Sequence, residues 1–378
     1  MKIVFLLPPL LEGSGGHRTI VQHAWYCEQI GHQVTVAVQE DSNVLDATGL
    51  STLIQELFEF RITDVCFWND VVLDAYDRVV CTAWFTLSWA IERNVLDKVT
   101  YFVQDWEAWF NPVGDSYIGA ERSYLAPCSH ISIGNFLAVK LLEFGHEAVA
   151  TPFGIDRDTY FVTDVARRRQ VCAIYQPEKP RRLPHTVLET LRTVKTIDPS
   201  IEIVLYGSRQ RPNVDFEYTW AGLMSPAELR VLYNHSKCGL ALSSTNPSRI
   251  PFEMAACKLP IVDVLAANTV FDAAGDAHLF SLPVPNALAR KIVRVVDDFD
   301  EIARSTDTIA SSEDETEAFL RGLESGGRVS VRSRTDLPGT VRMRLEKILS
   351  GIELFDSVDK HYIKKVQRDV SSLLAWLE

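Results

Sequence analysis

The stretch from residue 238 to residue 263 constrains the fold more than any other part of the chain. It contains an apolar run (Cys238 to Leu242), a loop rich in Ser, Thr, Asn and Pro, and a segment that Pro251 opens and Pro260 closes. Proline fits the first turn of a helix, where its missing N–H costs nothing, and it stops a helix elsewhere. Because a second apolar run follows directly, the stretch predicts strand, loop, helix and strand, which belongs to a parallel α/β sheet.

The loop and first helical turn of this unit are where a ligand would be held. A helix N-terminus presents unpaired N–H groups and the positive end of a dipole, so it favours phosphate. Asn246, Ser248 and Arg249 form the loop that faces such a ligand. Glu253 stands in the first turn, where a carboxylate can cap backbone donors or accept ligand hydroxyl groups, and both roles are open.

Length and charge limit the class of protein. A chain of 378 residues, 47% hydrophobic and 23% charged, predicts two globular domains with substantial cores. The net charge of −12 argues against a nucleic acid as the main partner. Basic clusters at 167–169 and 179–182 leave open a peripheral association with a membrane or a partner protein.

The cysteines and the apolar runs indicate the compartment. The seven cysteines are scattered and form no Cys-x-x-Cys pair, which predicts reduced core thiols and neither a disulfide framework nor a metal cage. No apolar run reaches the roughly 18 residues that span a bilayer. Pro8 and Pro9 interrupt the first run, so we interpret it as a strand and not as a signal peptide. We expect a cytoplasmic protein without cofactor or metal.

The N-terminus predicts a βαβ unit with a glycine-rich first turn. A buried strand (Lys2 to Leu7) leads to Gly15 and Gly16, and a helical pattern follows. A dinucleotide fingerprint would need glycine at Arg18, so a dinucleotide site is not favoured. His17 is either a ligand contact or a surface histidine.

The predicted strand Val99 to Val103 delivers two carboxylates, Asp105 and Glu107, among aromatic residues. Chemistry in α/β sheets is usually placed at strand ends, although two acids in a loop also suit a simple turn.

Two segments resemble retaining GT-B glycosyltransferases. The run EMAACKLPIV from Glu253 is similar to the second half of their nucleotide-sugar signature, and GHQVTV from Gly31 is similar to an N-terminal strand of theirs. The resemblance implies that Glu253 binds the donor ribose and that Gly15 and Gly16 let the backbone approach the donor diphosphate. The family's sugar-binding glutamate falls at Thr245, so that role does not carry over.

A further set of motifs resembles the rhamnan-type, WsaF-like rhamnosyltransferases. It comprises YFVQDWE from Tyr101, then Phe110, Gly114, Tyr117, the Tyr124 region, SIGN from Ser132 and TPFGID from Thr151. With EMAACKLPIV, the resemblance covers most of residues 1–270. It implies retaining transfer of L-rhamnose from dTDP-L-rhamnose to a lipid-linked polysaccharide glycan. Asp105 is then the first choice for handling the acceptor hydroxyl, and Glu107 the second.

The turn after the predicted strand Val171 to Tyr175 is basic. The resemblance implies an Arg and a Lys that grip the diphosphate here; the chain has Gln176 and Arg181, with Lys179 and Arg182 alongside. Guanidinium groups suit phosphate, so Arg181 and Arg182 are predicted diphosphate ligands, against the alternative of exposed loop charges. The next strand ends at Gly207, and Arg209 is a further phosphate candidate. The stretch 221–229 is implied to form the nucleobase pocket.

The C-terminal part carries a weaker signal. Residues 305–314 and 324–335 are predicted as loops. Acidic residues 297–300 follow an amphipathic helix and are interpreted as a solvated helix end, not a metal site. The segment from residue 360 to residue 378 is predicted as a helix that packs back on the N-terminal domain.

The sequence therefore predicts an α/β, GT-B fold of two Rossmann-like domains facing across a cleft. The N-terminal acceptor domain spans residues 1–160 and the C-terminal donor domain spans 165–350. The expected partners are a nucleotide-diphosphate sugar and a glycan acceptor, which the resemblance implies is lipid-linked. Alternatives are a non-catalytic GT-B subunit of a polysaccharide assembly complex, motivated by Thr245 and Gln176, then a nucleotide-sugar epimerase and, least, a dehydrogenase.

Overall fold

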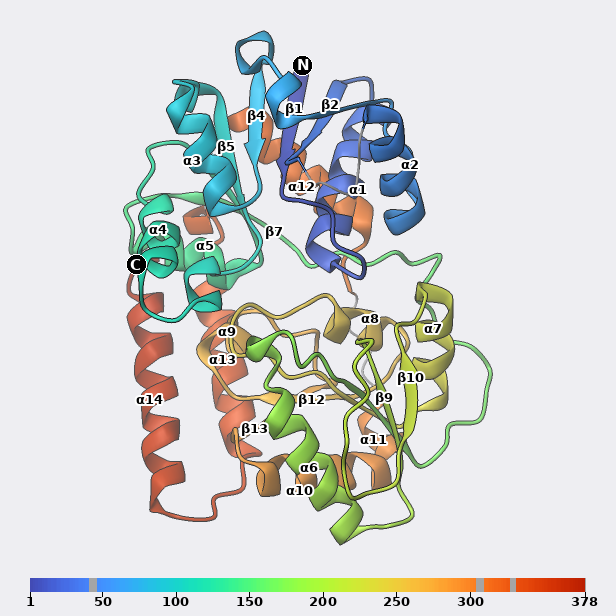
Figure 1. Ribbon diagram of the computed structural model, residues 1–378. Helices are drawn as coiled ribbons and strands as arrows, with labels where there is room; N and C mark the ends of the chain where they lie inside the picture. The colour runs from blue at the N-terminus through green and yellow to red at the C-terminus, as the bar shows by residue number, and fades with distance from the viewer. Residues whose placement is uncertain (41–45, 304–308, 327–330, 378) are drawn as a thin grey trace. The chain divides into compact units, whose positions relative to one another are not determined.

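The computed structural model describes residues 1–40, 46–303, 309–326 and 331–377 (Figure 1). The chain forms two compact units. The first combines Met1–Pro152 with Glu313–Arg334, and the second combines Phe153–Ser312 with Thr335–Glu378. Residues 313–334, which the sequence prediction gives to the second domain, are thus grouped with the first unit.

The first unit is built on a sheet of seven parallel strands within the described residues, in the order β3-β2-β1-β4-β5-β6-β7. The strands are β1 (Lys2–Leu7), β2 (Gln33–Val38), β3 (Asp64–Phe67), β4 (Arg78–Cys81), β5 (Val99–Val103), β6 (Ser129–Ile133) and β7 (Ala148–Thr151). The helices are α1 (Gly15–Gln29), α2 (Ala47–Phe58), α3 (Trp84–Glu92), α4 (Asp115–Ser123), α5 (Asn135–Leu142) and α12 (Ser312–Ser325). The 3-10 turns are η1 (Trp68–Asp70), η2 (Leu73–Ala75), η3 (Leu96–Lys98), η4 (Glu107–Phe110) and η6 (Val331–Ser333).

Burial on both faces explains why the central strands are almost continuously apolar. Every residue of β1 after Lys2 is fully buried. Helix α12 supplies part of that cover, and Figure 1 shows it in orange among the blue N-terminal elements. The ring of Phe319 in α12 stacks on Phe5 at 5.9 Å and meets Phe102 at 5.0 Å. The N-terminal core is therefore completed by a helix that is distant in sequence.

The second unit contains six parallel strands in the described residues, in the order β10-β9-β8-β11-β12-β13. The strands are β8 (Gln170–Ile174), β9 (Glu202–Tyr206), β10 (Thr219–Gly222), β11 (Cys238–Leu240), β12 (Ile261–Val264) and β13 (His278–Ser281). Its helical elements are η5 (Pro180–Arg182), α6 (Pro184–Ile197), α7 (Pro226–His235), α8 (Ile250–Ala256), α9 (Ala267–Phe271), α10 (Pro285–Asp297), α11 (Phe299–Ile302), α13 (Leu337–Ser350) and α14 (Ser357–Leu374). Both sheets follow the strand order of Rossmann-like folds.

The predicted stretch of strand, loop, helix and strand is confirmed as β11, α8 and β12. The loop predictions after residue 300 are partly wrong. Residues 312–314 begin α12, residues 324 and 325 end it, and 331–333 form η6. Polar residues dominate both ends of α12, and its apolar positions are buried in the first unit. Residues 305–308 and 327–330 of those predicted loops lie outside the described residues.

The C-terminal helix α14 contacts its own unit. The Tyr362 hydroxyl donates to the Leu265 carbonyl at 2.7 Å, and the helix packs against α9 and α13. Its apolar face is confirmed by the burial of Val366, Val370 and Leu374. The packing of this helix on the N-terminal domain stays a prediction.

Thiols and helix lengths complete the description. All seven cysteines are free, and five of them are buried, as expected for core thiols. Among the described residues, no helix combines the length and apolar character that crossing a bilayer requires.

Candidate functional site

In the second unit, the predicted donor residues lie where the strand order reverses. Strand β8 has β9 on one side and β11 on the other, and their connections leave the sheet in opposite directions. Ligands of open α/β sheets bind beyond the carboxyl ends of the strands at such a point. The loop after β8 carries Arg181 and Arg182, and the loop after β11 carries Asn246, Ser248 and Arg249.

The loop after β8 concentrates positive charge. Lys179, Arg181 and Arg182 stand within four residues, and all three are half-buried. Burial lowers the pKa of Lys179, and the charges of Arg181 and Arg182 lower it further. The charge of Glu178 acts on Lys179 in the opposite direction, and an anion held among the three cations would act in the same way as Glu178. The assignment of Arg181 and Arg182 as diphosphate ligands, and the alternative that they are loop charges, both stay predictions.

A hydrogen bond joins the two loops across the reversal point. The Ser244 N–H donates to the Arg181 carbonyl at 3.0 Å, and the Ser244 hydroxyl donates to the same oxygen at 3.2 Å. Leu183 follows with φ of +52°, a left-handed conformation that costs a non-glycine residue free energy. Pro184 then begins α6, so the cationic loop leads directly into a helix of 14 residues.

Gly207 directly follows β9, the strand next to β8. Its φ is +101°, and a Cβ built on it would lie 2.9 Å from the side chain of Ile174, so only glycine fits. The Gln176 amide donates to the Gly207 carbonyl at 3.2 Å, which links the loops after β8 and β9. Arg209, two residues later, is exposed.

The loop after β11 begins with buried residues and ends with half-buried ones. Thr245 and Asn246 are 2% and 1% exposed, whereas Ser248 and Arg249 are half-buried. The Asn268 amide of α9 donates to the Thr245 carbonyl. Arg249 donates to the carbonyl of Gly154, which ties this loop to the start of the second unit.

A buried carboxylate supports this loop from β12. Oδ1 of Asp263 accepts the Ser243 N–H at 3.1 Å, and the Ser243 hydroxyl donates to the Asn246 carbonyl at 2.8 Å. His278 on β13 faces Asp263, with Nε2 3.5 Å from Oδ2. Nδ1 of His278 accepts the Ala274 N–H at 3.1 Å, so in neutral His278 the proton is on Nε2, toward the carboxylate.

Glu253 lies near two buried phenols. Helix α8 has seven residues, its first position is Ile250, and Glu253 is half-buried. The hydroxyls of Tyr206 and Tyr233 are 3.1 Å apart. Burial raises the pKa of both tyrosines well above the usual range, and the charge of Glu253 adds to this effect, which places its carboxylate close to them. Glu253 is the fourth residue of α8, which follows the loop after β11.

In the first unit, the glycine-rich turn follows β1. Ser14 caps α1 by accepting the His17 N–H, and its hydroxyl lies 2.8 Å from His17 Nδ1. His17 is 7% exposed and stacks on Phe58, so the surface alternative is wrong. Burial lowers its pKa. A Cβ built on Gly16 would lie 3.7 Å from the side chain of Gln104, which directly follows β5 and precedes Asp105. Among the described residues, nothing comes within 4 Å of a Cβ built on Gly15.

Asp105 and Glu107 follow β5 in different surroundings. Asp105 accepts the Trp106 N–H at 2.8 Å, and Glu107 accepts the Trp84 N–H of α3 at 2.8 Å. Burial raises the pKa of Glu107 to about 8; the Trp84 hydrogen bond opposes this shift and the charge of Asp105 adds to it. An acid that titrates near neutral pH can give or take a proton during catalysis.

Several supporting residues escape sequence analysis. Ser244, Asp263 and Asn268 hold the loops of the second unit, while Trp84 and Tyr124 hold Glu107. An acid within the apolar run of β12 is a sequence signal for Asp263, since a buried charge needs partners. Ser244 and Trp84 act through backbone N–H groups, and the side chains of Asn268 and Tyr124 bond to backbone groups of residues distant in sequence, so the sequence does not single out these contacts.

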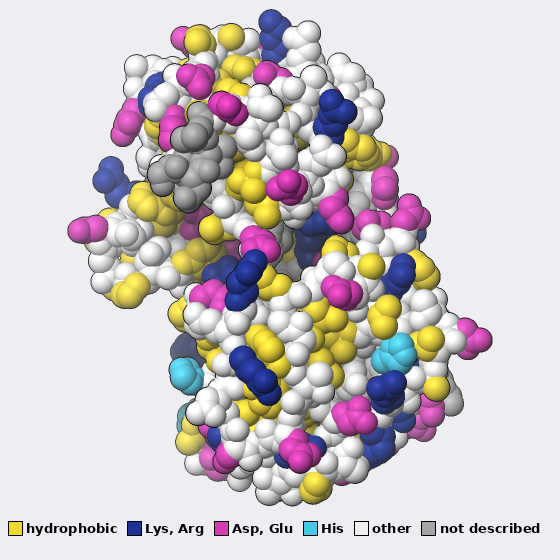
Figure 2. Space-filling view, turned by 45° about the vertical axis from the view of Figure 1, so that its right-hand side comes forward, with side chains coloured by type: hydrophobic (Ala, Val, Ile, Leu, Met, Phe, Trp, Pro, Cys, Tyr) yellow, Lys and Arg dark blue, Asp and Glu magenta, His cyan; other side chains and the backbone are white. Residues whose placement is uncertain are grey.

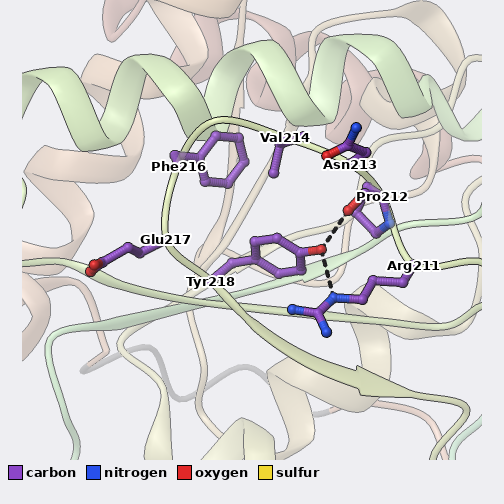
Figure 3. Close-up of a pocket in the computed structure, with 7 residues that line it drawn as sticks. All are labelled: Arg211, Pro212, Asn213, Val214, Phe216, Glu217 and Tyr218. Atoms are coloured by element: carbon purple, nitrogen blue, oxygen red, sulfur yellow. Dashed lines mark hydrogen bonds between the residues drawn. The ribbon is translucent and has the colours of Figure 1, made fainter.

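A separate cavity of about 720 Å³ lies within the loop between β9 and β10 (Figure 3). The Tyr218 hydroxyl donates to the Pro212 carbonyl at 2.5 Å and accepts from Arg211 Nε at 3.1 Å. None of the predicted site residues lines it, so we place the candidate site at the strand ends. Figure 2 shows a face on which acidic and basic side chains alternate with hydrophobic ones, without a broad basic surface.

One family model matches the second unit. Residues 169–293, which run from the start of β8 into α10, match the family described as "WsaF, C-terminal domain". No curated protein matches the chain by sequence.

Solved structures share the fold at low sequence identity. HepE of Anabaena, in complex with UDP and glucose, aligns with a TM-score of 0.63 at 14% identity, over 93% of this chain and 100% of that chain. Sucrose-phosphate synthase of Thermosynechococcus elongatus aligns with a TM-score of 0.61 at 11% identity, over 93% and 98%. A glycosyltransferase of Rickettsia africae aligns with a TM-score of 0.55 at 14% identity, over 93% and 99%. The fold is GT-B.

Proposed function

We propose that the protein is a glycosyltransferase that moves a sugar from a nucleotide diphosphate donor to a glycan acceptor. The observation that carries the proposal is the group of Lys179, Arg181 and Arg182, joined to the loop after β11 at the reversal point of a Rossmann-like sheet. The matching WsaF C-terminal domain model and the UDP complex of HepE support it. The donor we propose is dTDP-L-rhamnose, and the acceptor a growing cell-surface polysaccharide.

The chemistry follows from the charges at the two strand ends. The bond between the anomeric carbon and the diphosphate oxygen breaks, and the nucleoside diphosphate leaves with growing negative charge. Arg181 and Arg182 would stabilise that charge. The acceptor hydroxyl loses its proton as its oxygen attacks, and Asp105, with Glu107 beside it, receives this proton. We propose transfer with retention, following the sequence resemblance.

Glu253 completes the donor site in this proposal. It stands in α8, directly after the loop that follows β11, and we propose that its carboxylate accepts the ribose hydroxyls of the nucleotide. In the second unit, Arg209 follows β9, while Asn246 and Ser248 follow β11; in the first unit, Gly15, Gly16 and His17 follow β1. We propose that all six contact the donor.

The test is a thermal shift of the purified chain with dTDP, UDP, GDP and NAD. A ligand at about one hundred times its dissociation constant stabilises the folded state by roughly 2.7 kcal/mol. We expect dTDP to stabilise the protein, Glu253→Ala to lose the shift, and Glu202→Ala, exposed at the other end of β9, to retain it. If no nucleoside diphosphate shifts the wild-type protein, the proposed function is wrong.

A non-catalytic binding subunit is the second candidate. The buried Thr245 stands at the position of the family's sugar-binding glutamate, and Gln176 is held by Gly207 where the family has an arginine. Binding of dTDP without consumption of dTDP-L-rhamnose across a panel of glycan acceptors would select this candidate. Measurable rhamnosyl transfer would eliminate it.

A further inference from the structure

Two exposed aromatic side chains follow Glu107 in the same 3-10 turn. Trp109 and Phe110 are 41% and 40% exposed, although both are large and apolar. Aromatic rings left in water beside a carboxylate pair mark a surface that receives a ligand or partner. The reaction described above gives these rings no role.

The exposed ring of Trp109 belongs to a rigid stack. It contacts the rings of Trp106 and Phe136, each with centroids 6.2 Å away. Trp106 stacks on Tyr124 at 3.9 Å, and Tyr124 stacks on Tyr101 at 6.0 Å. The four supporting rings are buried. Because the stack already fixes Trp109, little conformational entropy is lost when a ligand rests on its outer surface.

The same residues hold the carboxylate. The Glu107 N–H donates to the Tyr124 hydroxyl at 2.7 Å, and the Asn111 amide donates to the Glu107 carbonyl at 3.4 Å. The Trp109 N–H donates to the Trp106 carbonyl at 2.9 Å. The aromatic surface and the acid therefore have a fixed spacing, as a subsite next to a reacting group requires.

We propose that Trp109 and Phe110 form a platform on which the terminal sugar ring of the glycan acceptor stacks. The inference rests on the proposed function and names the acceptor subsite of the same site. A pyranose ring has an apolar C–H face and a rim of hydroxyl groups, so it matches ring faces bordered by Asp105 and Glu107. In a deoxy sugar such as L-rhamnose, the methyl group extends the apolar face.

The charges nearby favour a sugar over a membrane surface. Val113 and Ile118 are exposed close by in the sequence, but Asp115 and Glu121 stand among them on α4. Anionic lipid headgroups would repel these carboxylates, and an acyl chain has no group that pairs with them. The platform also has a cation beside it, since Lys140 Nζ lies 5.3 Å from the centroid of the Trp109 ring and 3.0 Å from the Glu143 carboxylate. A sugar has hydroxyl groups that donate to carboxylates and an apolar face that rests on a ring, so it matches this mixed surface better than an acyl chain does.

The test is saturation-transfer NMR on the full chain, with methyl α-L-rhamnopyranoside as the probe. We expect signal transfer to its ring C–H and methyl protons to fall at least fivefold in Trp109→Ala. Trp109→Phe keeps a ring face and should retain at least half of the wild-type transfer. Trp376→Ala is the matched control, because Trp376 lies in the second unit and is 43% exposed; it should behave as wild type.

Three outcomes decide the proposal. Equal transfer in the wild type and in the double variant Trp109→Ala/Phe110→Ala overturns it. So does a Trp109-dependent fluorescence shift with anionic phospholipid vesicles when no transfer to the sugar is seen, because the occupant is then a membrane. Trp109-dependent transfer to the sugar supports the platform even if no nucleoside diphosphate shifts the melting temperature, in which case only the donor assignment fails.

Discussion

The two units share a strand order but carry opposite charges at the ends of their strands. In the first unit, the segment after β5 carries Asp105 and Glu107 among aromatic residues. In the second unit, the loop after β8 carries Lys179, Arg181 and Arg182, and the loop after β11 contains small polar residues. Under the proposed function, the sheet fixes where a site lies, while a few loop residues decide whether it handles a hydroxyl or a diphosphate.

The strongest way to break this comparison is Glu107→Gln. If the acid in the first unit moves a proton, turnover should fall by about 100-fold or more, while dTDP binding should stay within twofold. Rates of rhamnosyl transfer measured between pH 6 and 10 provide the second readout. The wild-type profile should change near pH 8, and the variant should lack that change. A variant that keeps wild-type turnover would exclude Glu107 from the chemistry.

The pKa of Glu107 also predicts a stability effect with a definite sign. The folded state keeps the proton up to about pH 8, whereas the unfolded chain releases it near its ordinary value. The stabilising contribution is therefore complete below about pH 4.5 and is lost as pH rises through 8. Urea unfolding of Glu107→Gln should show a weaker decline across this range than the wild type does.

Removal of the cations tests the other half of the comparison. Arg181→Ala/Arg182→Ala should weaken dTDP binding by roughly 150-fold or more, because hydrogen bonds to charged groups contribute about 1.5–3 kcal/mol each. Isothermal titration calorimetry measures the effect. The control is Arg192→Ala, an exposed arginine of α6 that pairs with Glu189 and Asp215. Equal losses in both variants would mean that general charge, not the site, attracts the nucleotide.

The buried pair in the second unit sharpens the comparison further. His278→Phe leaves Asp263 without its facing imidazole, and breaking a buried ionisable pair destabilises a fold by about 3 kcal/mol. We also expect amide hydrogen exchange of residues 243–249 to become faster and dTDP binding to weaken by about fivefold. Gln170→Ala removes a buried hydrogen bond to Ser236 at the opposite edge of the sheet. If Gln170→Ala accelerates amide exchange of residues 243–249 as much as His278→Phe does, the pair of Asp263 and His278 has no specific role in holding the loop.

The smallest effect concerns acid stability of the first unit. Burial and, to a smaller extent, the charge of His146 together lower the pKa of His130 to about 3. Below about pH 6.5, His130 is protonated in the unfolded chain but stays neutral in the folded chain. The free energy of unfolding therefore falls as the pH drops from 6.5 toward 3. His130→Phe should reduce this slope in melting temperatures measured from pH 4 to 7. His361→Phe, at an exposed position of α14, should not.

The sequence predicts much of the fold because parallel strands that are buried on both faces consist of consecutive apolar residues. The predicted strands Lys2 to Leu7 and Val99 to Val103 agree with β1 and β5. Helix α12 could not be predicted, since its polar ends resemble a loop and its apolar face is explained only by Phe5 and Phe102, which are far away in sequence.

For the site, the sequence identifies which side chains carry charge but not which ones support them. The hydrogen bond that joins the loops after β8 and β11 is donated by the backbone N–H of Ser244. Almost every residue type has this N–H, so the residue type at position 244 does not predict the bond. Asp263 becomes meaningful only when His278, on the next strand, is seen to face it. The roles of the predicted donor and catalytic residues stay predictions until the variants are measured.

The return of α12 to the first unit has a consequence for synthesis on the ribosome. The buried ring of Phe319, against Phe5 and Phe102, belongs to a segment made only after nearly all of the second unit's sheet has emerged. Until α12 has been synthesised, part of the core of the nascent N-terminal sheet therefore stays exposed to solvent. Expression of residues 1–152 alone should give a product that aggregates, while covalent fusion of residues 309–334 to that fragment should restore its solubility.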